Sequence, residues 1–346
     1  MRRNKLIILI FLFALLSINI PGAYSAALSE VFSVKPHDAY AQWKSLIGDY
    51  QGKDGKIIVL EEKGKLYILK DGKYQRIEGL KKDYYAVYRK GKPSEAFVRF
   101  TRNGEGIADK LIYDDKTYNR IFYGTESGKQ FRIKPVKPVE VLRLEAIKAK
   151  PPKDKGLFLY PEFVDIEKLD PTIKLDIKYA TSDNFMGVPF YTQPKAFMQK
   201  PAAQALVRVN KKLKPYGYCL LIYDAYRPWY VTKMFWDATP ENQKQFVGNP
   251  ENGSRHNRGC AVDVTLYDLK KDAPVSMTSG FDEFSSRAYP SYQGGTSLQR
   301  WNRWFLNTAM KEEGFTIYPY EWWHFDYKDW RKYPIMNIRF EDIKTK

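Results

Sequence analysis

Hydrophobic and polar positions follow two different periods in residues 157–346. Short stretches alternate apolar and polar residues, which is typical of strands, while longer stretches repeat apolar residues every three or four positions, which is typical of helices. The pattern predicts strands at residues 173–179, 218–223, 260–266 and 323–327, and helices at residues 201–213, 228–238 and 297–314. This part of the chain is therefore expected to be an α+β domain, with helices packed on an antiparallel sheet.

Residues 50–133 contain short strand-like stretches instead. Turn-forming pairs such as Asp71-Gly72 and Asn103-Gly104 separate apolar runs at residues 57–60, 66–69, 84–88 and 96–100. We assign residues 28–133 to a small antiparallel β domain on this pattern. A linker rich in proline and lysine follows at residues 134–156, with a short helix predicted at residues 139–149.

The first 27 residues have the layout of a secretory signal peptide. Basic residues precede an apolar run at residues 6–20, and small residues at positions 23–25 or 25–27 offer a cleavage site. A retained membrane anchor is the alternative, but the run is shorter than the roughly 20 residues that span a bilayer, and no later apolar segment is long enough. We expect an exported protein, periplasmic or extracellular, with no transmembrane segment after removal of the leader.

Positive charge is concentrated toward the N-terminal half of the chain. The formal net charge is +17, and residues 28–150 carry 26 basic and 17 acidic side chains, against 28 and 23 in residues 151–346. A positive β domain on an exported protein could contact anionic cell-surface polymers, although an ordinary solvated surface has the same composition. No dense basic helix or nucleic-acid motif occurs, which argues against a nucleic-acid partner.

The two cysteines, Cys219 and Cys260, fall in separate predicted strands. Export would permit a disulfide between them, and two buried thiols would fit the sequence equally well. Neither cysteine has the setting of a catalytic nucleophile.

Two short stretches near the C-terminus carry the candidate chemistry. Ser254 to Asp263 contains His256 and Asp263, and Glu321 to His324 adds a second imidazole. Two imidazoles and one carboxylate suit one zinc ion with three protein ligands and an open fourth position, whereas a structural zinc site would normally be closed by a fourth ligand. The spare carboxylate of Glu321 could take a proton from the attacking water.

The predicted strands are compatible with this metal site. Asp263 and His324 both point away from the apolar face of their strands, while His256 precedes Asp263 by an odd spacing that requires a turn, for which Gly259 is well placed. Any one of these polar residues alone would more often be a hydrogen-bonded structural residue. The chain has only three histidines, however, and two of them lie in these motifs beside carboxylates.

The two motifs resemble those of the zinc D-Ala-D-Ala peptidases of the M15 class. Within that class, three further stretches are similar to those of the VanX-type D-alanyl-D-alanine dipeptidases, namely Tyr179 to Gly187, Tyr223 to Trp229 and Phe281 to Phe284. The resemblance covers about residues 157–340, and its five motifs occur in the expected order. The β domain is an addition to the compact dipeptidase pattern.

The resemblance implies a role for each site residue. His256, Asp263 and His324 would bind zinc, Glu321 would act as the base, and Arg227 would stabilise the oxyanion. Asp282 would hold the ammonium of the substrate. The alternative for Asp282 is a turn or capping role, and the alternative for Arg227 is an ion pair with Asp224. The rest of the substrate pocket would be lined by Ser254, Tyr179 and Asp224.

The expected activity is hydrolysis of D-alanyl-D-alanine and related small dipeptides from cell-wall metabolism. Members linked to glycopeptide resistance are expected to act in the cytoplasm, so the export leader argues against a resistance role here. Two alternatives remain open. One is a zinc D,D- or L,D-carboxypeptidase or endopeptidase that acts on longer peptidoglycan peptides, and the other is a non-catalytic wall-binding protein.

Overall fold

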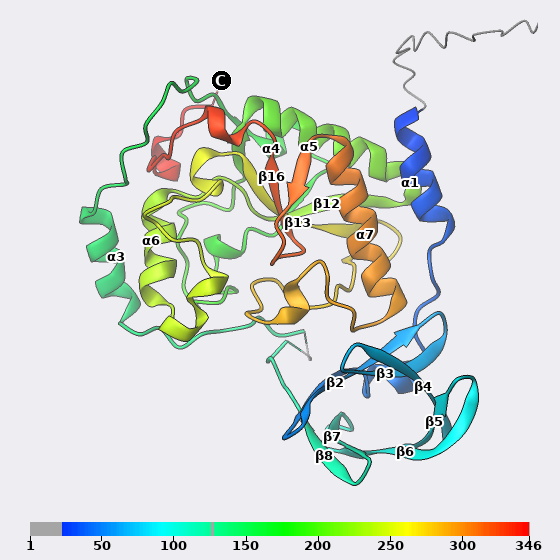
Figure 1. Cartoon of the computed structure of the whole chain (residues 1–346). Helices are drawn as coiled ribbons and strands as arrows, with labels where there is room; N and C mark the ends of the chain where they lie inside the picture. Colours follow the sequence, from blue (N-terminus) through cyan, green and yellow to red (C-terminus); the bar gives the residue numbers. More distant parts are fainter. Residues whose placement is uncertain (1–22, 126–127, 346) are drawn as a thin grey trace, which may run out of the picture.

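The computed structural model describes residues 23–125 and 128–345, which form a small barrel and a larger mixed domain (Figure 1). In Figure 1 the barrel lies below the larger domain, near the lower end of helix α7 (Ser297–Glu312). The basic residues and apolar run of the predicted signal peptide lie outside the described residues. Within those residues, no helix is both long and apolar enough to cross a bilayer.

The barrel consists of eight antiparallel strands in sequence order, and β1 closes the ring by pairing with β8. Its strands are β1 (Gly48–Gly52), β2 (Gly55–Glu62), β3 (Lys65–Lys70), β4 (Lys73–Lys81), β5 (Tyr84–Arg89), β6 (Lys92–Arg102), β7 (Ala108–Tyr113) and β8 (Lys116–Arg120). Tight turns such as Asp71-Gly72, where both residues have positive φ, match the twist of the hairpins. Side chains including Val59, Ile68 and Phe100 fill the interior.

The antiparallel β prediction is therefore confirmed, and its four apolar runs fall within β2, β3, β5 and β6. The other four strands were not predicted, and two of them, β4 and β8, bury only one apolar residue each. In β4, Ile77 is the buried residue, and in β8 it is Tyr118. Closure of the ring, rather than local hydrophobicity, holds these polar strands in place.

Two helices from the N-terminal half pack on the larger domain and not on the barrel. Helix α1 (Ala23–Ser33) lies beside α7, where Leu28 and Val31 are buried and the carbonyl of Val31 accepts a hydrogen bond from Trp301 Nε1 at 2.8 Å (Figure 1). Residues 28–33, assigned to the β domain from the sequence, thus belong to the core of the larger domain. The short helix predicted in the linker is confirmed as α3 (Val139–Lys148), which packs against α6.

The larger domain is built on one sheet with the strand order β10-β12-β13-β16-β15, and β14 pairs with β13. Its strands are β10 (Lys174–Leu175), β12 (Tyr218–Asp224), β13 (Ala261–Asp268), β14 (Ala273–Pro274), β15 (Phe315–Ile317) and β16 (His324–Tyr327). The sheet is mixed and not wholly antiparallel, since β10 runs parallel to β12. A separate antiparallel pair is formed by β9 (Phe163–Asp165) and β11 (Phe197–Gln199).

The predicted helices are confirmed within one or two residues. They are α5 (Lys200–Leu213), α6 (Trp229–Ala238) and α7. The short helices α2 (Ala41–Lys44) and α4 (Ile166–Leu169) were not predicted. The apolar face predicted for α5, including Leu206 and Val209, is fully buried. Thr296 begins α7 with a reciprocal capping box to Gln299.

The strand predicted at residues 173–179 is wrong beyond β10. Ile173, Ile177 and Tyr179 are all buried, which explains the alternation, but residues Lys178–Ala180 form a single turn of 3₁₀ helix. The chain leaves the sheet here, and Tyr179 reaches the pocket described below. The two cysteines lie on β12 and immediately before β13 as buried free thiols.

Candidate active site

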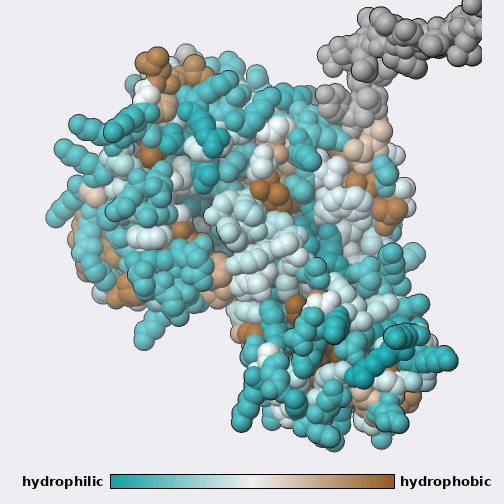
Figure 2. Space-filling view, in the orientation of Figure 1, coloured by the Kyte–Doolittle hydropathy of each residue, from teal (hydrophilic) through white to brown (hydrophobic). Residues whose placement is uncertain are grey.

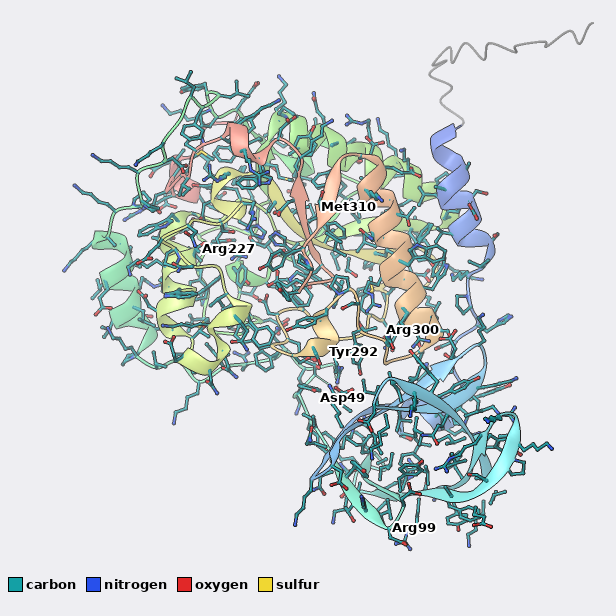
Figure 3. All side chains as sticks on the ribbon, viewed as in Figure 1. Asp49, Arg99, Arg227, Tyr292, Arg300 and Met310 are labelled. Atoms are coloured by element: carbon teal, nitrogen blue, oxygen red, sulfur yellow. The ribbon has the colours of Figure 1, made fainter. Side chains whose placement is uncertain are left out.

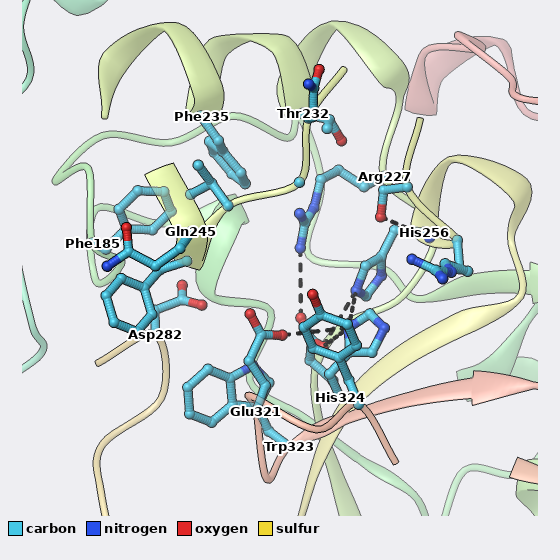
Figure 4. A pocket seen from close by; sticks show the side chains of 18 of the residues that line it. Phe185, Arg227, Thr232, Phe235, Gln245, His256, Asp282, Glu321, Trp323 and His324 are labelled. Atoms are coloured by element: carbon cyan, nitrogen blue, oxygen red, sulfur yellow. Dashed lines mark hydrogen bonds and ion pairs between the residues drawn. The ribbon is translucent and has the colours of Figure 1, made fainter. Parts of the chain in front are cut away.

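Neighbouring strands and one tight turn bring His256, Asp263 and His324 together (Figure 4). Asp263 on β13 and His324 on β16 are direct cross-strand partners. His256 begins a 3₁₀ turn, His256–Arg258, which Gly259 ends at φ +67° before β13 starts. The turn predicted at Gly259 is confirmed, and a side chain there would also collide with Phe163, since a Cβ would lie 2.7 Å from its ring.

The three side chains meet the geometric requirement of a tetrahedral metal site. Asp263 Oδ1 lies 3.1 Å from His324 Nδ1 and 3.3 Å from His256 Nε2, and the two ring nitrogens are 3.1 Å apart. Ligand atoms at the usual zinc bond lengths of about 2.0–2.2 Å would be about 3.3 Å apart in a tetrahedron. All three residues are buried, with exposed fractions of 7 % or less.

The other nitrogen of each imidazole is hydrogen-bonded away from this cluster. His256 Nδ1 lies 2.6 Å from the carbonyl oxygen of Ala225, which can only accept, so Nδ1 donates and Nε2 keeps its lone pair. His324 Nε2 lies 2.9 Å from Asp326 Oδ1 in the same way. Such partners orient metal-binding histidines and raise their basicity. The residues present therefore fit a divalent metal ion.

The electrostatics of the cluster also favour a positive charge at its centre. Burial would lower the pKa of His324, but Asp326 and Asp263 outweigh it and raise this pKa to about 10. Burial would raise the pKa of Asp263, yet the two imidazoles hold it well below its ordinary range. Two lone pairs and a carboxylate oxygen that point at one another are stable when a proton or a metal cation lies between them.

Glu321 lies at the edge of the cluster without joining it. Its Oε2 is 3.7 Å from His324 Nδ1, and its side chain lines the pocket with 22 % of its surface exposed. Burial raises the pKa of Glu321 to about 7, since the attraction of His324 only partly offsets the loss of hydration. A carboxylate with this pKa beside the pocket is suited to exchanging protons near neutral pH.

Arg227 reaches the pocket from the segment between β12 and α6 (Figure 4). Its guanidinium is held by Asp224, whose Oδ2 accepts from Nε at 2.9 Å and lies 2.8 Å from Nη2, and Nη2 lies 3.5 Å from Asp263 Oδ2. The ion pair with Asp224, which the sequence left open as an alternative role for Arg227, is therefore present, and Arg227 also faces the pocket. The guanidinium also stacks on Tyr179 and Phe235, with its carbon 5.1 and 5.0 Å from the ring centres.

Asp224 itself is placed differently from the sequence interpretation. It is fully buried behind Arg227, accepts a hydrogen bond from Tyr191 Oη at 2.7 Å, and does not line the pocket. The residue ends the buried strand β12, so its side chain faces the interior. Its contacts with Arg227 and, at 3.7 Å, with His256 Nδ1 make it a support for both residues.

The remaining candidates do line the pocket. Asp282 accepts a hydrogen bond from Tyr179 Oη at 2.7 Å, and burial raises its pKa well above its ordinary value. Ser254 Oγ accepts from the backbone N–H of His256 at 3.2 Å, which braces the turn that carries this histidine. Asp282 and Glu321 both approach the pocket from the side opposite α6 (Figure 4).

The pocket is small, with a volume of about 250 Å³. Aromatic side chains form part of its wall: Phe185, Phe284 and Trp323 lie within the sequence motifs, whereas Phe235 and Phe246 lie outside them. Phe246 and Phe284 stack with ring centres 5.1 Å apart. The contact between Asp326 and His324 was also missed, although their spacing of two on one predicted strand was the available signal.

Comparison with known proteins agrees with this geometry. A family model described as Peptidase_M15, D-ala-D-ala dipeptidase, matches residues 160–344, which is just over half of the chain. The chain belongs to the M15 D-Ala-D-Ala dipeptidase family. Members of this family depend on a metal ion, and the protein is accordingly a metallopeptidase with dipeptidase activity.

Individual relatives in the M15 family support the same assignment. The D-alanyl-D-alanine dipeptidase of Escherichia coli strain K12 is 35 % identical over 179 residues, which cover 52 % of this chain and 91 % of the relative. Those of Enterococcus faecalis V583 and Enterococcus faecium are 33 % and 32 % identical, and cover 51 % and 48 % of this chain and 96 % and 92 % of the relatives. The M15 model begins after the barrel, which is therefore additional to the matched domain.

Proposed function

We propose that the protein is an exported zinc dipeptidase that hydrolyses D-alanyl-D-alanine and related small dipeptides from cell-wall metabolism. The observation that carries the proposal is the convergence of His256, Asp263 and His324 at tetrahedral spacing beside Glu321. Two imidazoles, one carboxylate and a fourth position open to the pocket are typical of catalytic zinc. The proposed substrate class is taken from the relatives, which are named D-alanyl-D-alanine dipeptidases.

Each site residue has a role that its surroundings support. A zinc ion held by the three ligands would supply Lewis acidity, polarising the scissile carbonyl and lowering the pKa of a water at the open position. Glu321 takes the proton of the attacking water and passes it to the departing amine. Arg227 faces the same space with a permanent positive charge and stabilises the oxyanion as the carbonyl carbon becomes tetrahedral.

Asp282 is the residue proposed to bind the free ammonium of the substrate. Its carboxyl is buried, and a ligand ammonium would stabilise the ionised form that burial disfavours. Tyr179 Oη fixes the orientation of this carboxyl. A cavity of about 250 Å³ is at the small end for ligand pockets, which favours a dipeptide over a longer chain.

The proposal is tested by assaying purified protein against D,D-, L,D- and L,L-dipeptides, with and without a chelator. We expect turnover of D-alanyl-D-alanine that the chelator abolishes and added zinc restores, with Glu321→Gln protein as the inactive control. An acylated tripeptide and a wall pentapeptide belong in the same panel. Faster cleavage of these longer substrates would instead favour the carboxypeptidase or endopeptidase, and binding without turnover would favour a non-catalytic wall protein.

Export and contact with anionic wall polymers complete the proposal. The leader supports export, and N-terminal sequencing of the mature protein should show a start after Ser25 or Ala27. The face of the barrel seen in Figure 2 is mainly hydrophilic, and the barrel residues 48–120 carry 17 basic and 12 acidic side chains, an excess of positive charge that supports attraction to anionic polymers. Binding to an anionic polymer that weakens as salt rises, with no binding to a neutral polymer, would support this contact.

A further inference from the structure

The loop that carries Asp282 is held by contacts from inside and outside the loop. We call residues 278–288 the substrate loop. Asp282 has φ +54°, a left-handed turn conformation that aspartate adopts more readily than most residues, as Asp71 and Asp272 also do in this chain. The next residue, Glu283, is 1 % exposed, so its carboxylate must find partners inside the protein.

The buried carboxylate of Glu283 contacts several other residues of the substrate loop. Its Oε1 accepts a hydrogen bond from Ser285 Oγ at 2.6 Å and lies 3.3 Å from Arg287 Nε. Its Oε2 accepts from the backbone N–H of Gly280 at 3.3 Å. These contacts join both ends of the loop to one buried carboxylate, and Asp282 lies directly beside it.

The chain that leaves the barrel adds two contacts on either side of Asp282. We call residues 121–125 and 128–133 the connector. Thr125 Oγ1 donates a hydrogen bond to Glu283 Oε2, and Gln130 Nε2 donates to the carbonyl oxygen of Phe281 at 2.8 Å. Thr125 also packs closely on Gly280, where an added Cβ would lie 2.9 Å from Thr125 Cγ2. Both residues that flank Asp282 are therefore tied to the connector.

Asp49, a barrel residue, hydrogen-bonds both to the connector and to the segment that follows the substrate loop. Asp49 is fully buried and accepts hydrogen bonds from Tyr123 Oη at 3.2 Å and from Tyr292 Oη at 2.5 Å. Asp49 and Tyr292 lie at the junction of the two domains (Figure 3). Displacement of the barrel would therefore be transmitted to both sides of the substrate loop.

We infer that Glu283 is a positioning residue, through which the connector holds Asp282 at the ammonium end of the pocket. The inference rests on the role proposed above for Asp282. The connector and barrel precede residue 160, where the family match begins, so this support is an addition of this chain to the dipeptidase domain. It gives the barrel a part in substrate binding that is independent of any wall polymer.

The kinetic consequence is specific to substrate binding. The connector contacts reach the loop at Phe281 and Glu283. The loop meets the turn that carries Glu321 at other points, since Ser279 Oγ and the carbonyl oxygen of Ala288 accept hydrogen bonds from the indole and backbone N–H groups of Trp322, each at 2.9 Å. Loosening the connector contacts should thus weaken the hold on the ammonium, while the Ser279 and Ala288 contacts keep the turn of Glu321 in place. A hydrogen bond to a charged group is typically worth enough to change an equilibrium by roughly tenfold.

The decisive variant is Thr125→Val, which keeps the shape of the side chain and removes the hydroxyl donor. Thr125→Ser should rescue it, and Thr101→Val is the matched control, because Thr101 Oγ1 donates to Asp109 at 2.9 Å on the exposed surface of the barrel. We expect Thr125→Val to raise KM for D-alanyl-D-alanine roughly tenfold, with kcat within about twofold and metal content unchanged. Hydrogen exchange of residues 278–288 should also become faster.

Failure of the inference can be told apart from failure of the proposed function. Asp282→Asn, measured in parallel, should raise KM by more than Thr125→Val does, and an unchanged KM there would remove the ammonium role of Asp282. If Asp282→Asn acts as expected but Thr125→Val has wild-type KM and wild-type exchange, the inference is wrong. A joint loss of kcat, metal and thermal stability in Thr125→Val would show a merely structural contact and would also overturn it. The exchange measurement decides the loop's dependence on Thr125 even if no dipeptide is hydrolysed.

Discussion

Asp326 Oδ1 lies 2.9 Å from His324 Nε2, on the opposite side of the imidazole from Asp263. Both residues belong to β16, two positions apart, and so share one face of the strand. Burial would raise the pKa of Asp326, but His324 outweighs it and keeps this carboxyl ionised. Asp326 thereby fixes the tautomer that presents Nδ1 to the metal position.

Asp326→Asn should weaken metal binding without removing a ligand. Loss of such a hydrogen-bonded partner typically costs about 10- to 100-fold in metal affinity. Competition with a chelator, followed by elemental analysis, measures this change. Asp329→Asn is a suitable control, because Asp329 pairs with Lys332 on the surface nearby. Equal metal retention in the two variants would show that Asp326 does not tune the site.

Glu321→Gln should retain the metal and lose most turnover. The amide keeps the size of the side chain but cannot accept the proton of the attacking water, and a positioned base typically contributes about 10²- to 10⁴-fold in rate. Steady-state kinetics together with metal analysis checks both parts of this prediction. A rate near that of the unaltered protein would exclude Glu321 from proton transfer.

Arg227→Lys should lower kcat/KM by about 10²- to 10³-fold, the usual effect of losing one oxyanion donor. Lysine keeps the charge but cannot bind Asp224 through two nitrogens while also facing the pocket, as Arg227 does. Kinetics and circular dichroism on the same preparation separate catalysis from folding. Unchanged kcat/KM in a folded variant would assign Arg227 to the ion pair alone.

Glu61→Gln tests the attachment of the barrel. Glu61 on β2 is 2 % exposed, and its Oε2 accepts a hydrogen bond from the backbone N–H of Ser297 at 2.7 Å, at the N-terminus of α7. Losing this charged contact should lower the free energy of unfolding by about 1–2 kcal/mol. Chemical denaturation measures the change, with Glu62→Gln as the control, since Glu62 is partly exposed and pairs with Arg300. A larger effect of Glu62→Gln would contradict this account.

Local patterns were sufficient for much of the fold. The helices α5, α6 and α7 follow from apolar repeats that their own residues bury, β12 from the apolar run at residues 218–223, and β13 from the alternation at residues 260–266. The polar strands β4 and β8 and the turn at Tyr179 could not be predicted in this way. Their conformations depend on pairing or packing with distant residues, which leaves no periodic signal in the local sequence.

The candidate ligands could be named from the sequence, because only three histidines occur and two of them accompany carboxylates in recognisable motifs. The residues that support these ligands could not be named from the sequence. Asp224 was expected in the pocket wall and lies behind Arg227, and the contact of Thr125 with Glu283 joins residues 158 positions apart. Such partnerships depend on side-chain directions across separate elements, which the sequence does not encode at short range.

The sequence by itself determined which residues have metal-binding and acid–base chemistry, since that depends on residue type and on spacing within short motifs. The tertiary structure decided that three of them meet at 3.1–3.3 Å, that Asp326 orients His324, and that the connector reaches the loop of Asp282. The physical reason is that coordination and hydrogen bonding require atoms within about 3 Å. Only the folded chain brings residues so far apart in sequence to that distance.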